Sequence, residues 1–105
     1  MSEYLTFTHS LQDDLLTIAA TGELDVATER ALVDEFVHQL RIQTVATVVL
    51  DLRGITFIDS SGLRAILNCR RVAADTGVAM KLQTAEGPVL KLLKVGGIES
   101  VFEYL

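Results

Sequence analysis

The feature that most constrains the fold of this chain is an apolar run, VATVVLDL, at residues 45–52. Several of its side chains are β-branched, which favours the extended conformation of a strand. A run with so few polar interruptions is typical of a strand that is covered on both faces, or nearly so. We therefore predict a central strand over residues 45–52, followed by a loop or short edge over residues 53–59.

The segments around this run change between the repeat typical of strands and the repeat typical of helices. Residues 4–9 alternate as strands do, and residues 15–21 are predicted to form a second strand; the polar residues 10–14 between them predict an antiparallel pair. Two longer helices are predicted: one over residues 28–41, capped by Asp25 or Thr28, and one that Ser60 or Ser61 caps and that ends near residue 76. In the second of these helices Leu63, Ile66 and Leu67 should point inward. The remaining predicted elements are a strand over residues 78–82, a short helix that begins at Pro88 and ends before Gly96, and a last strand or extended segment over residues 98–105.

This order of elements, in which strands and helices alternate after an opening pair of strands, predicts an α/β fold. The parallel connections should be right-handed and should give a mixed sheet of four to five strands packed with helices. A chain of 105 residues buries roughly two thirds of its unfolded surface, which is enough for one core without a metal or a disulfide. We therefore expect residues 1–105 to form a single domain.

Charge and cysteine content narrow the possible functions. The chain has 9 Lys and Arg against 14 Asp and Glu, a formal net charge of −5, so nucleic acid, which attracts clustered positive charge, is not expected as a partner. Its one cysteine, Cys69, cannot form an intramolecular disulfide, and no Cys and His cluster has metal-ligand spacing, so we expect no metal and no cofactor. The sequence shows neither a signal peptide nor an apolar run of about 18 residues, which favours a cytoplasmic protein without a membrane segment.

The polar residues that follow the central strand form the main candidate site. Asp59, Ser60, Ser61 and Gly62 lie between this strand and the start of the next predicted helix. In α/β proteins ligands and partners bind at the carboxyl ends of parallel strands, and the N–H groups at a helix start favour an anion such as phosphate. The simpler interpretation is that the serines only cap the helix, because serine is a preferred N-cap residue.

A second candidate cluster, TGELD at residues 21–25, follows the second predicted strand. If that strand neighbours the central one, Glu23 and Asp25 lie beside Ser60 and form an acidic patch available to a basic partner. The alternative is that Asp25 serves only as a helix cap, and the two roles do not exclude each other.

The motifs of common enzymes are missing around these residues. Neither Ser60 nor Ser61 has a glycine two residues before it, as the Gly-X-Ser-X-Gly elbow of hydrolases requires. His9 and His38, the possible general bases, fit exposed positions better than a catalytic role. A glycosidase-like carboxylate pair would need a cleft that a chain of this size scarcely provides. We therefore expect a protein that is not an enzyme and has no catalytic residues.

Three segments closely resemble the anti-sigma-factor antagonists of the STAS domain family: TGELD at residues 21–25, VVLDLRGITFIDSSGL at residues 48–63 and GPVLKLLKVGGIESVF at residues 87–102. The resemblance implies a STAS fold that works as a switch. Members bind a serine-kinase anti-sigma factor and free the sigma factor; phosphorylation of one serine breaks the complex, and a metal-dependent serine phosphatase restores it. The phosphorylated serine directly follows the Asp of the motif, which makes it Ser60 here, and the acidic loop residue of the family matches Asp25.

The resemblance also implies a partner surface at the edge where these motifs meet. Two other functions stay open: a STAS subunit of a signalling scaffold or lipid-transport assembly in which the serine is never modified, and a module that binds a small anion at the same edge. The residues expected to contact the partner are Glu23, Asp25, Asp59, Ser60, Ser61, Gly62 and Leu63.

Overall fold

The computed structural model describes residues 4–105 and contains one four-stranded sheet in the order β1-β2-β3-β4. The strands are β1 (Leu5–Gln12), β2 (Leu15–Leu24), β3 (Thr47–Ile58) and β4 (Ala79–Gln83). β1 pairs antiparallel with β2, whereas the β2–β3 and β3–β4 pairs are parallel. The predicted mixed sheet, the opening antiparallel pair and the central position of the apolar run are therefore confirmed.

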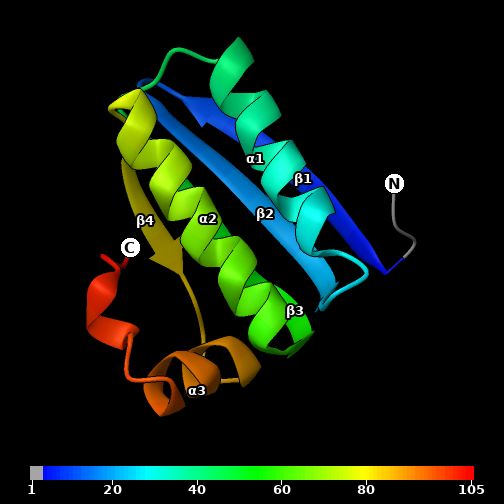
Figure 1. Ribbon diagram of the computed structural model, residues 1–105. Helices are drawn as coiled ribbons and strands as arrows, with labels where there is room; N and C mark the ends of the chain where they lie inside the picture. Colours follow the sequence, from blue (N-terminus) through cyan, green and yellow to red (C-terminus); the bar gives the residue numbers. More distant parts are fainter. Residues whose placement is uncertain (1–3) are drawn as a thin grey trace.

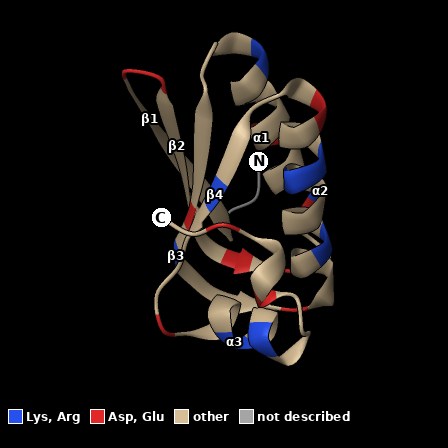
Figure 2. Cartoon of the chain, turned by 90° about the vertical axis from the view of Figure 1, so that its left-hand side faces the viewer, with Lys and Arg blue, Asp and Glu red and all other residues tan. Residues whose placement is uncertain are grey.

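Three α-helices in the described residues follow the parallel strands: α1 (Glu29–Ile42), α2 (Ser60–Thr76) and α3 (Pro88–Val95). α1 and α2 lie side by side over one face of the sheet, and α3 packs against β3 at the end where β3 leads into α2 (Figure 1). Seen from the side, the opposite face of the sheet carries no helix of residues 4–105 (Figure 2). Because α1 and α2 cover the same face and follow strands that run parallel, both helices start at the same end of the molecule.

The core lies between the sheet and the two long helices. Val48 and Leu50 of β3 belong to it, and Val49 between them faces the other side of the sheet and is also buried. Burial on both sides explains why this strand has no polar alternation in its first half. The other large side chains fully buried in the core include Leu16 and Ile18 of β2, Leu32 and Phe36 of α1, Ile66 of α2 and Leu82 of β4.

The central strand is longer than predicted. The prediction for residues 53–59 was a loop or a short edge strand. β3 continues to Ile58, so the loop is wrong and the edge strand is correct for residues 53–58. These residues pair with β2 alone, because β4 pairs with β3 only as far as Asp51. β2 itself extends to Leu24 and follows β3 through two shifts of register. Gly54 permits the close pairing, since a Cβ on it would lie 2.7 Å from the Thr21 hydroxyl oxygen.

The predicted helices are confirmed to within one residue at each end, but one inward position is wrong. Leu67 of α2 is 37% exposed, because Ile66 and Cys69 occupy the face of the helix that meets the sheet. Gly77 ends α2 in the left-handed conformation, with a φ of 74°, as its position predicts.

The last residues contribute little to the sheet. Instead of a full strand they form a short 3-10 helix (Glu99–Val101) and a single parallel bridge between Tyr104 and Leu82. The Tyr104 hydroxyl donates to the carbonyl oxygen of Glu99 at 2.7 Å, which folds the segment back on itself. The terminal segment thus pairs with β4 at one residue only.

Candidate functional site

The carboxyl ends of β2 and β3 bring the two candidate clusters together. Leu24 pairs with Ile58, and the N–H of Asp59 donates to the carbonyl oxygen of Leu24 at 3.2 Å. The loop after β2, residues 25–28, therefore lies beside the start of α2. The predicted meeting of the two loops at one edge of the sheet is confirmed.

Asp59 caps α2. Its backbone is extended, and its Oδ1 accepts hydrogen bonds from the N–H groups of Ser61 at 2.9 Å and Gly62 at 3.2 Å. The prediction that Ser60 or Ser61 is the cap is wrong, because both serines already belong to the first turn of the helix. A carboxylate suits the cap position, since the positive end of the helix dipole stabilises its charge.

Ser60 presents its hydroxyl to solvent. The residue is exposed, whereas Ser61 is half-buried. Within residues 4–105 the Ser60 hydroxyl takes part in no hydrogen bond. Because Asp59 does the capping, the helix start does not depend on this hydroxyl, and another protein can reach its oxygen.

Gly62 allows α2 to start close to β2. A Cβ on this residue would lie 2.6 Å from the carbonyl oxygen of Leu24 and 2.8 Å from Cγ1 of Ile58. A larger residue would push the helix away from the strands. Leu63 is half-buried against the core, and its N–H donates to the carbonyl oxygen of Asp59 at 3.0 Å. Both residues therefore have a structural task at this edge.

Thr28 organises the loop between β2 and α1 and is fully buried. Its hydroxyl donates to the carbonyl oxygen of Glu23 at 2.7 Å and accepts from the N–H of Asp25 at 3.0 Å. Oδ1 of Asp25 accepts from the N–H of Ala27 at 3.0 Å, in the loop before α1. The prediction that the Asp25 side chain caps α1 is therefore wrong. Thr28 occupies the N-cap position, but its side chain makes no cap bond, because its hydroxyl bonds within the loop.

Sequence reasoning missed two apolar side chains at this edge. Val26 is 72% exposed in the loop after β2, and Phe57 is 48% exposed near the end of β3, opposite Glu23 in the register. Exposed aromatic side chains such as Phe57 are enriched at surfaces that bind proteins. The available signals were two apolar residues at positions predicted to lie outside the core: Val26 between the second strand and the first helix, and Phe57 in the loop or short edge over residues 53–59.

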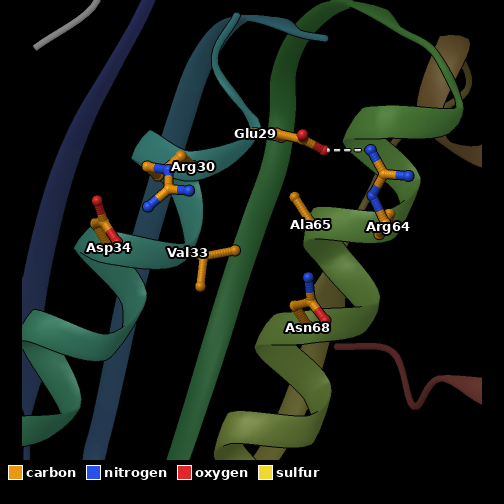
Figure 3. A pocket seen from close by; sticks show the side chains of 7 residues that line it. All are labelled: Glu29, Arg30, Val33, Asp34, Arg64, Ala65 and Asn68. Atoms are coloured by element: carbon orange, nitrogen blue, oxygen red, sulfur yellow. Dashed lines mark hydrogen bonds and ion pairs between the residues drawn. The ribbon is translucent and has the colours of Figure 1, made fainter. Parts of the chain in front are cut away.

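A groove separates the first turns of α1 and α2. It has a volume of about 250 Å³, and Glu29 and Arg64 face each other across it (Figure 3). One guanidinium nitrogen of Arg64 donates to Oε2 of Glu29 at 2.9 Å. The Arg64 side chain is therefore exposed and at the same time paired with α1. The residues that line the groove are Glu29, Arg30, Val33, Asp34, Arg64, Ala65 and Asn68.

The other chemistry-bearing groups lie apart from this edge. On β3, hydrogen bonds from Arg53 lower the pKa of Asp51, and the two side chains form an ion pair of 2.9 Å. Burial raises the pKa of the Cys69 thiol, which makes this cysteine unreactive. His9 and His38 are exposed, as predicted. In residues 4–105 no group of His, Cys, Asp or Glu is arranged to hold a metal ion, and no helix is long and apolar enough to cross a membrane.

Several solved structures share this arrangement of strands and helices. An anti-sigma factor antagonist from Mycobacterium paratuberculosis has a TM-score of 0.81 and 18% identity, over 95% of this chain and 85% of that one. The antagonist SpoIIAA in its unphosphorylated form has a TM-score of 0.74 and 19% identity, over 95% and 88%. The murine Slc26a9 anion transporter in its inward-facing state has a TM-score of 0.75 and 18% identity, over 87% of this chain and 15% of the transporter.

At identities this low, similarity between structures establishes the fold and leaves the activity open. The model of the STAS domain family, however, matches residues 8–104. A match over nearly the whole chain confirms the resemblance carried by residues 21–25, 48–63 and 87–102, and this chain belongs to the STAS domain family.

Proposed function

We propose that this chain is an anti-sigma-factor antagonist that binds a serine-kinase anti-sigma factor, frees the sigma factor and is switched off by phosphorylation of Ser60. Residues 1–105 act as one domain in the cytoplasm, without enzymatic activity or a cofactor, and a metal-dependent serine phosphatase reverses the modification. The proposed partner surface consists of Glu23, Asp25, Asp59, Ser60, Ser61, Gly62 and Leu63.

The observation that carries the proposal is the state of the Ser60 hydroxyl. It is exposed, it has no hydrogen-bond partner within residues 4–105, and it sits on a helix start whose position is fixed by the cap of Asp59. A kinase acceptor must be reachable and must be able to change without unfolding the protein. In the modification the Ser60 oxygen takes the γ-phosphoryl group of ATP, ADP leaves, and the hydroxyl proton is released.

Charge explains how the modification would break the complex. A phosphoserine carries about −1.5 to −2 charge, and it would stand between the loop of Asp25 and the carboxylate of Asp59. Oδ1 of Asp59 already accepts from the N–H groups of Ser61 and Gly62, so these donors are not free to neutralise a phosphate. A partner surface that suits Asp25 and Asp59 would therefore meet extra negative charge and bulk at its centre.

The exposed apolar side chains support protein binding at the same edge. Val26 and Phe57 flank the acidic loop, and burial of large apolar groups supplies much of the affinity of a protein interface. An anion-binding module would have less use for them. Between the proposed functions, a protein partner therefore fits this edge better than a small anion.

The direct experiment combines the chain with serine-kinase anti-sigma factors of its host and ATP. We expect the cognate kinase to add one phosphate to the wild type and to Ser61→Ala, and none to Ser60→Ala. Ser61→Ala is the matched control, because it removes the neighbouring hydroxyl from the same helix turn. Phosphate incorporation that persists in Ser60→Ala would refute the assignment of the acceptor.

One structural similarity favours a second function, a STAS subunit that is never modified. The fold also matches part of an anion transporter, over 15% of that chain. The intact mass of the protein purified from its native host distinguishes the two functions. A phosphorylated fraction that disappears after phosphatase treatment supports the switch, whereas a mass that is always unmodified, even with the cognate kinase active, supports the fixed subunit.

A further inference from the structure

Arg64 lies one helical turn after Ser60. Side chains four residues apart on a helix share one face, with Cβ atoms about 5–6 Å apart, and they lean toward the amino end of the helix. The Arg64 side chain therefore leaves its backbone toward the turn that carries Ser60, and both residues are exposed. A guanidinium is thus available next to any group added to the Ser60 oxygen.

In the unmodified chain Arg64 has its partner on the other helix. A single N–H of its guanidinium donates to Oε2 of Glu29 at 2.9 Å, across the mouth of the groove between α1 and α2 (Figure 3). The Arg64 side chain is 64% exposed, and the contact uses one of the five donors of the guanidinium. Ion pairs of this kind are weak, so a stronger anion nearby can take the guanidinium over.

The start of α2 offers few other donors to a phosphate on Ser60. The N–H groups of Ser61 and Gly62 are held by the Asp59 carboxylate, and the N–H of Leu63 donates to the Asp59 carbonyl oxygen. A phosphate would have to displace Asp59 or find a side-chain cation. Arg64 is the cation that the helix places one turn away.

We propose that phosphorylation of Ser60 transfers Arg64 from Glu29 to the phosphate, and so opens the ion pair that bridges α1 and α2. This inference rests on the proposed function, which makes Ser60 the acceptor. A phosphate carries up to about twice the charge of a carboxylate, and arginine can donate two parallel N–H bonds to it. The modification therefore changes the surface at two places: it adds a phosphate and leaves the Glu29 carboxylate unpaired at the groove.

The charged groups around Arg64 are mostly acidic. Glu29, Arg30 and Asp34 of α1 line the same groove, and Asp25 and Asp59 lie at the edge next to Ser60. Four of these five groups are acidic, so they hold the guanidinium near this end of the molecule in either state. What changes on phosphorylation is the anion to which Arg64 donates.

The chain with phosphoserine placed at residue 60 during synthesis tests this transfer without any kinase. Phosphorus NMR follows the second pKa of the phosphate, which is near 6 for phosphoserine. We expect Arg64→Gln to raise this pKa by about 0.5 pH unit, because a neighbouring cation favours the dianion. The control is Arg71→Gln, which removes an exposed arginine about three turns from residue 60 and should change the pKa by no more than about 0.1 pH unit.

A second measurement follows the Nε signal of Arg64. Glu29→Gln should shift this signal in the unmodified chain and leave it unchanged in the phosphorylated chain, since only the unmodified chain keeps the pair. Equal phosphate pKa values in Arg64→Gln and Arg71→Gln, or equal responses to Glu29→Gln in both forms, would overturn the inference. A kinase that modifies a residue other than Ser60 would refute the proposed function. The response of Arg64 would still be measured on the chain with phosphoserine at residue 60, because that chain is made without a kinase.

Discussion

The two long helices begin with similar residues and use them differently. Each follows the carboxyl end of a parallel strand, and each start combines an aspartate with a hydroxyl residue. Before α1, the hydroxyl of Thr28 is fully buried and joins Glu23 to Asp25. At α2, the carboxylate of Asp59 makes the cap bonds, and the hydroxyl that follows it has no hydrogen bond within residues 4–105.

The difference shows what makes a hydroxyl available at a helix start. A serine or threonine there normally satisfies backbone groups, and modifying it would cost the fold those bonds. An aspartate that takes over the cap releases the hydroxyl beside it. At the start of α2 the capping carboxylate and a hydroxyl without a partner in residues 4–105 therefore belong to separate residues, whereas at the start of α1 the hydroxyl is committed to the fold.

The largest effect is expected at Asp25, which lies in the loop before α1 and belongs to the proposed partner surface. Asp25→Ala removes two loop hydrogen bonds that Oδ1 accepts, one from the N–H of Ala27 at 3.0 Å and a longer one from the Thr28 hydroxyl at 3.3 Å, and should reduce the free energy of unfolding by about 1 kcal/mol. Loss of a charge pair buried at an interface should weaken binding of the anti-sigma factor by about 2–5 kcal/mol. Calorimetric titration and urea unfolding of the same variant measure the two effects.

The matched control for this prediction is Asp75→Ala, which removes an exposed aspartate near the far end of α2. It should change neither the binding nor the unfolding free energy by more than about 0.5 kcal/mol. If Asp25→Ala weakens binding no more than it weakens folding, Asp25 serves only the loop.

The next largest effect tests the buried hydroxyl. Thr28→Val keeps the shape of the side chain and leaves the carbonyl oxygen of Glu23 and the N–H of Asp25 without this partner. We expect the free energy of unfolding to fall by about 2–3 kcal/mol, because buried polar groups without partners are costly. Thr28→Ser retains the hydroxyl and is the control in urea unfolding. A loss below about 0.5 kcal/mol for Thr28→Val would remove the contrast between the two helix starts.

The sequence predicted those features of the two helix starts that depend on the local order of polar and apolar residues. The apolar run at residues 45–52 indicated the central strand, and the residue types at residues 21–25 and 59–63 indicated two loops at one edge. The sequence did not predict which residue caps α2. That depends on where β3 ends, and β3 reaches Ile58 only because the extended end of β2 pairs with it.

Contacts between segments distant in the sequence could not be predicted either. Asp25 or Thr28 was expected to cap α1, and only the folded loop shows that the Thr28 hydroxyl instead donates to Glu23 and accepts from Asp25. The pair of Arg64 and Glu29 joins residues 35 positions apart, so no helical spacing reveals it. Hydrogen-bond partners across elements are set by the packing of α1 against α2, and a single sequence does not encode them in any local repeat.

A smaller effect is expected from the cap of α2. Asp59→Ala removes the acceptor for the N–H groups of Ser61 and Gly62, and should reduce the free energy of unfolding by about 1 kcal/mol. Asp59→Asn keeps an oxygen acceptor in the same place and should retain most of the stability, so it serves as the control. Equal losses for both variants in urea unfolding would show that the charge of Asp59, and not its capping bonds, stabilises the start of α2.

The smallest effect is predicted for the hydroxyl of Ser60, the proposed phosphate acceptor. Ser60→Ala should change the free energy of unfolding by no more than about 0.5 kcal/mol, because the hydroxyl has no partner within residues 4–105 and alanine is the better helix former. Ser61→Ala is the control from the same turn, and thermal unfolding compares both with Thr28→Val. A loss above about 1 kcal/mol for Ser60→Ala would mean that this hydroxyl supports the helix start as Thr28 supports the other loop. Phosphorylation would then act by weakening the fold at α2, and the separation between a capping residue and a switching residue would fail.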